Sequence, residues 1–173
     1  MDRFRLRRSW VLGLLSSLSL VVGLPGLLGS APPPGLELEE GWIVGVDARG
    51  RRVWQLVAAS VTVEERTGVA AFVQPRGVFF AQDGRPVQFR AQRGEYAFRT
   101  GRVALVGSVE IVVSRDRWLR AARAVYEGGQ IQAEGVQLRW ERLQGRGDRL
   151  VADVGLRRAR LVGNVRLEAV EEP

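Results

Sequence analysis

Apolar and polar residues alternate along much of the chain after Gly41. In residues 158–168 the odd-numbered positions carry small or apolar side chains, and all but one of the even-numbered positions carry polar or charged ones. Successive side chains of a strand point to opposite faces, so this pattern predicts a strand with one dry and one wet face. Residues 87–92 and 136–141 alternate in the same way. Helical periodicity is confined to a weak indication over 118–126, so residues 41–168 are expected to form an all-β domain.

The alternation changes phase at Gly135. Ile131 and Ala133 carry the apolar pattern on odd positions, whereas Val136 continues it on even positions. An extra residue that shifts the phase is typical of a β-bulge or a bend, and glycine is common at both. The sequence therefore predicts a bulge or corner at Gly135.

Two short motifs recur with a common period of about 30 residues. The first is a large apolar residue, any residue, then alanine, and it begins at Leu56, Phe89, Leu119 and Leu150. The second is a glycine just before a valine strand, and its glycines are Gly77, Gly107, Gly135 and Gly163. A shared period of this length predicts stacked strand pairs, each covering the apolar edge of the one before. A generic β-sandwich with similar strand lengths is the alternative.

The N-terminal part of the chain contains an uncharged apolar segment, residues 10–29. As a helix this segment would be about 30 Å long, which matches the hydrocarbon core of a bilayer. Four arginines in residues 1–9 precede it, and a basic flank stays on the cytoplasmic side. The predicted organisation is a cytoplasmic tail (1–9), a transmembrane helix (10–29), a linker (30–40), a periplasmic β-domain (41–168) and a C-terminal tail (169–173).

A cleaved signal peptide is the competing interpretation of this segment. Gly29, Ser30 and Ala31 offer small residues at a suitable spacing for cleavage. Pro32 would then follow the cleaved bond directly, and the apolar run exceeds the ~7–15 residues of a usual signal peptide. The sequence favours an uncleaved anchor and leaves the signal peptide open.

The charge of the chain gives no sign of nucleic-acid binding. The formal net charge is +7, and all 26 basic residues are arginines. Beyond the N-terminal cluster the arginines lie beside acids, as at Arg115, Asp116 and Arg117. A nucleic-acid binder needs a concentrated basic face, so these charges indicate a hydrated surface.

The composition also excludes several kinds of catalytic and metal site. The chain has no His and no Cys, which removes thiol nucleophiles, Ser-His-Asp triads, disulfides and ordinary zinc or iron–sulfur sites. Adjacent acids occur at 39–40, 64–65 and 171–172, but neighbouring residues on a strand face opposite ways and do not converge. We therefore expect no enzyme activity, no cofactor and no metal.

The layout of one anchor, a short spacer and repeated short strands resembles the LptC family of lipopolysaccharide-export proteins and the related OstA/LptA domain. The segments that carry this resemblance are Trp54–Ala58, Phe89–Tyr96, Leu119–Tyr126, Leu105–Ile111 and Leu161–Leu167. The last two look like the family's leucine-x-glycine-asparagine-valine strand, although Ser108 replaces the asparagine in the first. Gly135-Val136 lacks the preceding leucine. The resemblance covers roughly residues 10–168.

The resemblance implies an open, twisted β-jellyroll that receives lipopolysaccharide from an inner-membrane ABC transporter. Acyl chains that cross water must stay covered, since each exposed CH₂ costs about 0.8 kcal/mol. Alternation gives the inward-facing candidates for lipid contact, and each of them could equally fill an ordinary core. These candidates are Phe80, Phe89, Tyr96, Phe98, Val109, Ile111, Leu138, Trp140 and Leu161.

The resemblance further implies docking through the two open ends of the jellyroll. A terminal strand has unpaired N–H and C=O groups to which another sheet can add a strand. The family's N-terminal edge meets LptF/LptG-like transporter subunits, and its C-terminal edge meets an LptA-like periplasmic bridge protein. Carried over by position, the docking residues are Trp42, Val44 and Val46 at the first edge and Leu161, Gly163, Asn164, Val165 and Leu167 at the last.

Two alternative functions share the predicted strands. A soluble LptA-like bridge protein would result if the N-terminal segment were cleaved. A bactofilin-like structural β-solenoid polymer would also have stacked strands and self-pairing ends, but such scaffolds are usually cytoplasmic, which the outward topology opposes. The favoured prediction is a single-pass inner-membrane protein with most of the chain in the periplasm.

Overall fold

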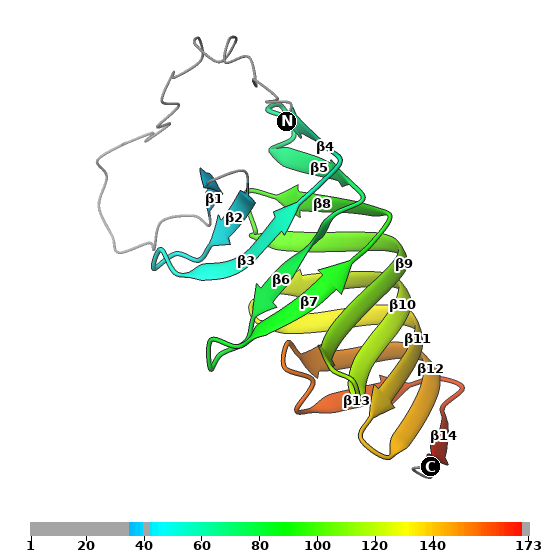
Figure 1. The fold of residues 1–173 in the computed structure, drawn as a ribbon. Coiled ribbons are helices and arrows are strands. Elements are labelled where there is room, and N and C mark those ends of the chain that lie inside the picture. The colour runs from blue at the N-terminus through cyan, green and yellow to red at the C-terminus, as the bar shows by residue number, and fades with distance from the viewer. Residues whose placement is uncertain (1–34, 40–41, 171–173) are drawn as a thin grey trace, which may run out of the picture. The chain divides into compact units, whose positions relative to one another are not determined.

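The computed structural model describes residues 35–39 and 42–170, which form a single fourteen-stranded sheet (Figure 1). Every pair of neighbouring strands is antiparallel. The strands are β1 (Gly35–Glu39), β2 (Trp42–Val46), β3 (Arg52–Val57), β4 (Ser60–Glu64), β5 (Val69–Val73), β6 (Arg76–Phe80), β7 (Pro86–Arg90), β8 (Arg93–Ala97), β9 (Arg102–Ser114), β10 (Arg117–Glu127), β11 (Gln130–Trp140), β12 (Leu143–Asp153), β13 (Ala159–Val162) and β14 (Arg166–Ala169). The predicted all-β class is confirmed for this part of the chain.

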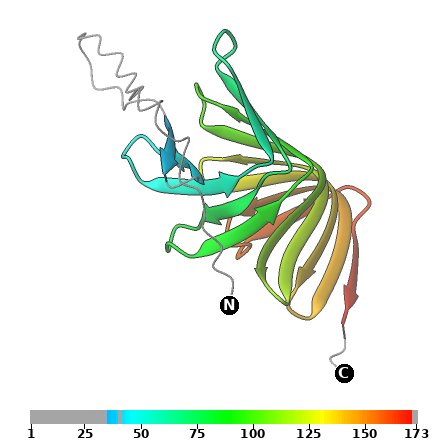
Figure 2. The ribbon, with the colours of Figure 1, turned by 45° about the horizontal axis from the view of Figure 1, so that its top comes forward.

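The sheet folds into two layers because β9 pairs with different strands along its length. Its first part, 102–106, pairs with β8, and its later part, 110–112, pairs with β7. We call layer I the strands β1, β2, β3, β6 and β7 together with the parts of β9–β12 in line with them and β14. Layer II contains β4, β5, β8, the other parts of β9–β12 and β13. Figure 2 shows the two layers meeting along one side and spreading apart on the other.

The chain turns from one layer to the other at a row of corners. Left-handed backbone conformations mark most of them, at Gln74, Gly107-Ser108, Gly135 and Gly163-Asn164. Neighbouring corners are joined by backbone hydrogen bonds, with Gln74 N donating to Gln92 O at 2.8 Å and Gln92 N to Gly107 O at 2.9 Å. Gly135 of β11 has no cross-strand partner in either β10 or β12, so the pairing skips this residue on both sides. The corner predicted at Gly135 is therefore confirmed.

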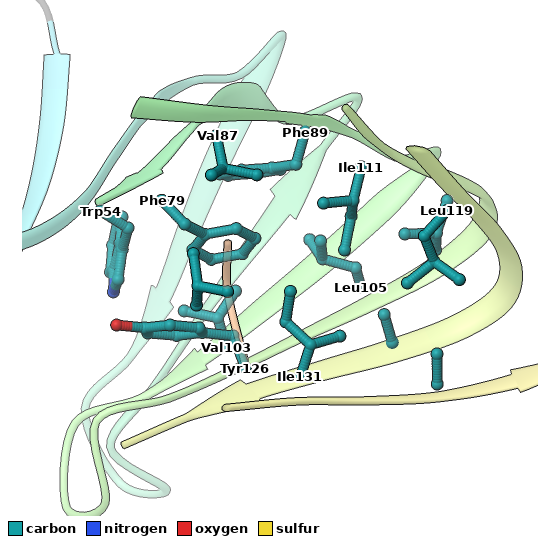
Figure 3. Packing of buried hydrophobic residues seen from close by; sticks show 14 of the residues in the cluster. Trp54, Phe79, Val87, Phe89, Val103, Leu105, Ile111, Leu119, Tyr126 and Ile131 are labelled. Atoms are coloured by element: carbon teal, nitrogen blue, oxygen red, sulfur yellow. The ribbon is translucent and has the colours of Figure 1, made fainter. Parts of the chain in front are cut away.

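A continuous apolar core fills the space between the layers (Figure 3). Aromatic rings from opposite layers touch: Trp54 lies edge-on to Tyr96, with ring centroids 5.0 Å apart, and Phe79 stacks on Tyr126 at 4.5 Å. Val87, Phe89, Val136 and Leu138 are buried while the residues between them are more exposed, as the alternation predicted. The residues described include no fully buried polar or charged side chain.

The 30-residue period corresponds to two passes of the chain across the layers. Gly107, Gly135 and Gly163 all lie at corners, whereas Gly77 lies inside β6. The alanines of the first three apolar-x-alanine motifs end a layer I segment, but Leu150 and Ala152 lie in layer II. The fourth copy of this motif is thus out of structural register with the other three.

Four expectations need correction or fall outside the structure. Residues 158–168 are not one strand, because the corner at Gly163-Asn164 divides them into β13 and β14. The weak helical indication over 118–126 belongs to strand β10, and residues 35–39, expected in the linker, form strand β1. The predicted transmembrane segment 10–29 lies outside the described residues, and no helix within 35–39 and 42–170 is long and apolar enough to cross a bilayer.

Candidate functional site

A cleft of about 860 Å³ lies where the two layers spread apart, on the side opposite the corners. The β2–β3 and β6–β7 turns of layer I form one lip, and the β8–β9, β10–β11 and β12–β13 turns of layer II form the other. Its lining comprises 46–48, 51–54, 80–82, Gly84, Tyr96, 100–101, Tyr126, 128–129, 153–155 and Arg157. The corners close one side of the molecule, so the turns at the free ends of the strands define the opening.

Two aspartates fix the turns of the layer I lip. The Asp47 carboxylate accepts hydrogen bonds from the backbone N–H groups of Arg49 at 2.9 Å and Arg51 at 3.0 Å. Asp83 accepts one from Arg85 N at 3.2 Å. The backbone hydrogen bond from Arg51 lowers the pKa of Asp47, and that from Arg85 lowers the pKa of Asp83. Both carboxylates are therefore charged at neutral pH, and each forms an ion pair with an arginine of its own turn, Asp47 with Arg51 and Asp83 with Arg85.

Aromatic side chains form the floor of the cleft. Trp54, Tyr96 and Tyr126 line it and are all at most 4% exposed. Burial raises the pKa of Tyr96 to about 12. Burial, and then the charge of Asp47, raise the pKa of Tyr126 to about 12. Both phenols are therefore neutral at physiological pH and give the floor hydrogen-bonding groups without charge.

The indole of Trp54 lies against the backbone of Gly45, its cross-strand partner. A Cβ atom at Gly45 would lie 2.3 Å from Trp54 Nε1, so only glycine leaves room for this ring. Trp54 Nε1 is buried and has no hydrogen-bond partner among the described residues. Buried polar groups are nearly always paired, so this N–H is an unusual donor beside the cleft.

The nine predicted lining residues fall into three groups. Phe80 and Tyr96 line the cleft itself. Leu138 and Trp140 border a small space of about 10 Å³ between the layers nearer the C-terminal end. The remaining predicted residues are packed into or against the core, namely Phe89, Phe98, Val109, Ile111 and Leu161.

Sequence reasoning missed several residues of the cleft and core. Phe79 is fully buried and stacks with both Phe89 and Tyr126, while its neighbour Phe80 is half-buried. The β6–β7 hairpin register places Phe79 opposite Val87, and the alternation of Val87 and Phe89 was the signal that could have given this phase. Trp54 and Tyr126 belong to different layers and come near each other only in the folded sheet, so no local sequence pattern identifies them as cleft residues.

The predicted N-terminal edge is not an edge. Trp42, Val44 and Val46 lie in β2, which pairs with β3 on one side and with β1 on the other. Leu36 and Leu38 alternate with Glu37 and Glu39, which extends the strand pattern upstream of Gly41. Among the described strands, β1 is therefore the first of layer I and β4 the first of layer II.

The predicted C-terminal edge is divided between two strands. Leu161 lies in β13, Leu167 in β14, and Gly163, Asn164 and Val165 form the connection between them. β13 pairs with 149–152 of β12 and β14 with 143–146, so each layer ends with one short strand. Three apolar side chains of this end are exposed: Val162 (46%), Val165 (43%) and Leu167 (58%).

Comparisons with known proteins agree with this architecture. Residues 43–169 match the family model "Lipopolysaccharide-assembly, LptC-related". The crystal structure of LptH from Pseudomonas aeruginosa, described as the LptA homologous periplasmic component of the lipopolysaccharide transport device, is similar in fold. Its TM-score is 0.52 at 13% sequence identity, and the match covers 69% of this chain and 95% of LptH. No curated protein sequence matches the chain.

Proposed function

This chain belongs to the LptC-related family of lipopolysaccharide-assembly proteins, and from that premise we propose that it is the membrane-anchored periplasmic component that carries lipid between two partners. It would accept lipopolysaccharide from an inner-membrane ABC transporter with LptF/LptG-like subunits and pass it to an LptA-like bridge protein. Residues 10–29 would anchor it in the inner membrane. The role in lipopolysaccharide transport follows from the family, and the direction, the anchor and the partners are the proposal.

The observation that carries the proposal is an apolar interior that opens along one side. The core between the layers is continuous from Ile43 to Leu156, and the cleft reaches its aromatic part at Trp54, Tyr96 and Tyr126. Two layers joined only along their corners can separate at the opposite side with little loss of strand pairing. Acyl chains entering there would exchange water for apolar side chains, at about 0.8 kcal/mol per buried CH₂.

The outer face of the sheet carries paired charges. This supports an orientation in which lipid lies inside and water outside. Glu110 lies between Arg90 of β7 and Arg120 of β10, and Arg120 Nε donates to Glu110 Oε1 at 3.0 Å. Arg117 pairs with Glu141 at 2.7 Å near the end of layer I. Paired charges on one face and apolar residues on the other suit a carrier that hides lipid inside and remains hydrated outside.

Site-specific photocrosslinking tests lipid contact. A photoreactive residue at Phe89 or Leu138, both facing inward, is expected to form lipopolysaccharide adducts in cells with an active transporter. The matched controls are Gln88 and Gln137, the exposed neighbours on the opposite faces of β7 and β11. Adducts should be absent at these two positions. Failure to label any inward position while the transporter is active would contradict the proposal.

A soluble bridge protein is the second candidate function, favoured by the fold likeness to LptH. The two candidates differ at the N-terminus of the mature protein. A start at Met1 or Asp2 together with membrane fractionation supports the anchored component, whereas a start at Pro32 supports the bridge. Intact-mass measurement of the protein purified from cells distinguishes them.

A further inference from the structure

The loop between β12 and β13 turns into the space between the layers. This loop, Val154–Arg158, is called the gate segment below. Val154 is 2% exposed and Leu156 is 4% exposed, although both belong to a connection between strands. By contrast, the neighbouring β10–β11 turn consists only of Gly128 and Gly129.

Leu156 fills the interior of the C-terminal half. It borders the small space that Leu119, Leu138 and Trp140 approach from layer I, and Leu150 and Ala159 line the same space from layer II. Leu156 therefore occupies the position between the layers where an acyl chain on its way to β13 and β14 would have to lie. Neither the β10–β11 turn nor the β11–β12 turn contributes a buried side chain in this way.

Hydrogen bonds to Asp153 hold the base of the gate segment, whereas Leu156 has a strained backbone. Arg158 N donates to Asp153 Oδ1 at 2.6 Å, and Leu156 N donates to Asp153 O at 2.9 Å. Leu156 itself has a φ of 48°, a left-handed conformation that a branched side chain adopts at an energetic cost. Strained residues of this kind are frequent in segments that switch between two conformations.

An ion pair joins the gate segment to the opposite lip. Arg157 Nη1 lies 3.7 Å from Asp83 Oδ2 of the β6–β7 turn, and both side chains are more than a third exposed. Asp83 also bonds Arg85 more closely, at 2.9 Å, so the contact across the opening is the weaker of its two. Exposed ion pairs contribute little to stability, which suits a contact that must break and reform.

This contact stands between two clefts. Gln82, Asp153 and Arg157 line both the main cleft and a second cleft of about 640 Å³ that extends along β12 and β13. Separation of Arg157 from Asp83 would therefore join the two openings along the side of the molecule. The lipid path toward the C-terminal strands would then be continuous.

We propose that the gate segment is a displaceable plug: Leu156 occupies the C-terminal half of the lipid path, and Arg157 fastens the segment to Asp83 across the opening. The inference rests on the proposed function. Lipid that reaches this half takes the place of Leu156, and the segment returns when the lipid has passed on. Without lipid the plug keeps water from the apolar interior.

A thiol cross-link across the opening tests the gate. The chain has no cysteine, so Asp83→Cys with Arg157→Cys introduces the only two thiols. A short bismaleimide suits this pair, because the long side chain of Arg157 spanned most of the gap and a direct disulfide requires closer backbones. The full-length chain carries a photoreactive residue at Leu138 or Phe89, in membranes with an active transporter. Treatment is expected to abolish lipopolysaccharide adducts at Leu138 and to leave those at Phe89, and each single-cysteine chain serves as the control.

The possible outcomes separate the gate from the function on which it rests. Equal labelling at Leu138 with and without the cross-link overturns the gate alone. Absence of adducts at both positions in the untreated chain overturns the proposed function and the gate with it.

A second variant tests the plug itself. Leu156→Gly removes the side chain and relaxes the left-handed backbone, so adducts at Leu138 should rise severalfold. General damage to the fold would lower labelling, so a rise cannot come from unfolding. Val106→Ala, which trims an exposed side chain of β9 that lines neither cleft, is the matched control and should leave labelling unchanged. Unchanged labelling in Leu156→Gly would overturn the plug.

Discussion

The corners of the sheet depend on single residues with left-handed backbone. Gly107 and Ser108 have φ values of 79° and 46°, and Gly163 and Asn164 have 76° and 46°. A residue with a Cβ atom adopts this conformation at a cost of about 1–2 kcal/mol, and asparagine tolerates it better than most. At Gly107 and Gly163 the recurring glycine is thus part of a corner, in which two left-handed residues redirect the chain before β9 continues at Val109 and before β14 begins at Arg166.

Glu110 provides a test of electrostatics at the residue scale. Glu110 lies in β9, directly opposite Arg90 of β7 on one side and Arg120 of β10 on the other, and its side chain is 17% exposed. Burial alone would raise the pKa of Glu110, but hydrogen bonds from Arg120 and Arg90 hold that pKa below its usual range. We expect Glu110→Gln to lower the free energy of unfolding at pH 7 by about 1 kcal/mol, the size of two cross-strand ion pairs.

The lowered pKa of Glu110 determines how the stability difference between Glu110→Gln and the wild type changes with pH. A carboxyl group with a lowered pKa in the folded state stabilises fully above its unfolded pKa, about 4.3, and loses this contribution as the pH falls through the folded value. Urea unfolding should therefore separate Glu110→Gln from the wild type at pH 7 and bring the two together as the pH falls through the lowered pKa of the folded state. The control is Glu95→Gln, since Glu95 faces Ala71 and Ala104 across the sheet. A difference that persists in acid would rule out the ion pairs as its source.

At the scale of elements, β3 and β6 approach each other through Gly77. A Cβ atom there would lie 2.0 Å from the carbonyl oxygen of Gln55 and 2.8 Å from the Cα of Leu56. Backbone atoms of a paired strand cannot move aside as a flexible side chain can. We expect Gly77→Ala to lower the free energy of unfolding by about 3 kcal/mol, measured by urea unfolding.

The location of the damage distinguishes this explanation from a general loss of stability. Hydrogen exchange in Gly77→Ala should accelerate in β2 and β3, which are joined to the rest of layer I through β6. Val78→Ala changes the next residue of the same strand, which is half-buried, and should cost much less. If both variants are equally stable, the close approach of the two strands does not depend on glycine.

The strands were predictable from sequence because alternation is a local signal. It identified β7, the later part of β11 and the corner at Gly135 correctly. The break at Gly163-Asn164 was missed because the alternation continues through it, and the similar corner at Gly107-Ser108 leaves β9 as one strand. The difference is that β9 is paired on both sides, with β10 on one and with β7 and β8 on the other, whereas β13 and β14 are held only by β12.

The cleft was less predictable than the strands because it forms between layers. Trp54 and Tyr96 are more than 40 residues apart in sequence, yet their ring centroids are 5.0 Å apart. Leu156 continues on even positions the apolar pattern of Leu150, Ala152 and Val154, so the sequence carried a signal for its burial, but the pattern does not show that Leu156 lies in a loop between the layers. Inward-facing residues such as Val109 and Ile111 were identified, but which of them touch the opening depends on how the two layers diverge.

At the scale of the whole molecule, the C-terminal end presents β14 as the last strand of layer I among the described residues. Val165 lies outside both end strands, so a proline there would not remove a strand N–H group. Proline at Leu167 or at Glu168 removes adjacent N–H groups of β14, and adjacent groups point to opposite edges of a strand. In one of the two variants, the amount of an LptA-like bridge protein that copurifies should fall roughly fivefold. This factor corresponds to the loss of one hydrogen bond of about 1 kcal/mol.

The other proline variant is the internal control for this test. It removes an N–H group directed at β12, so it should loosen β14 in hydrogen exchange without removing the donors of the free edge. Circular dichroism checks that both variants remain folded. Copurification at the wild-type level in both would show that β14 is not where the bridge protein docks.

The division of the last edge into β13 and β14 limits how a neighbouring sheet can attach. A straight edge lets an added strand slide by two residues and still form the same hydrogen bonds, since the ladder repeats with that spacing. Here the bend at Gly163-Asn164 interrupts the ladder once, so an incoming strand must bend at the matching place. The bend thus selects one alignment of the incoming strand with β13 and β14. Successive modules joined in this way would keep their openings on the same side.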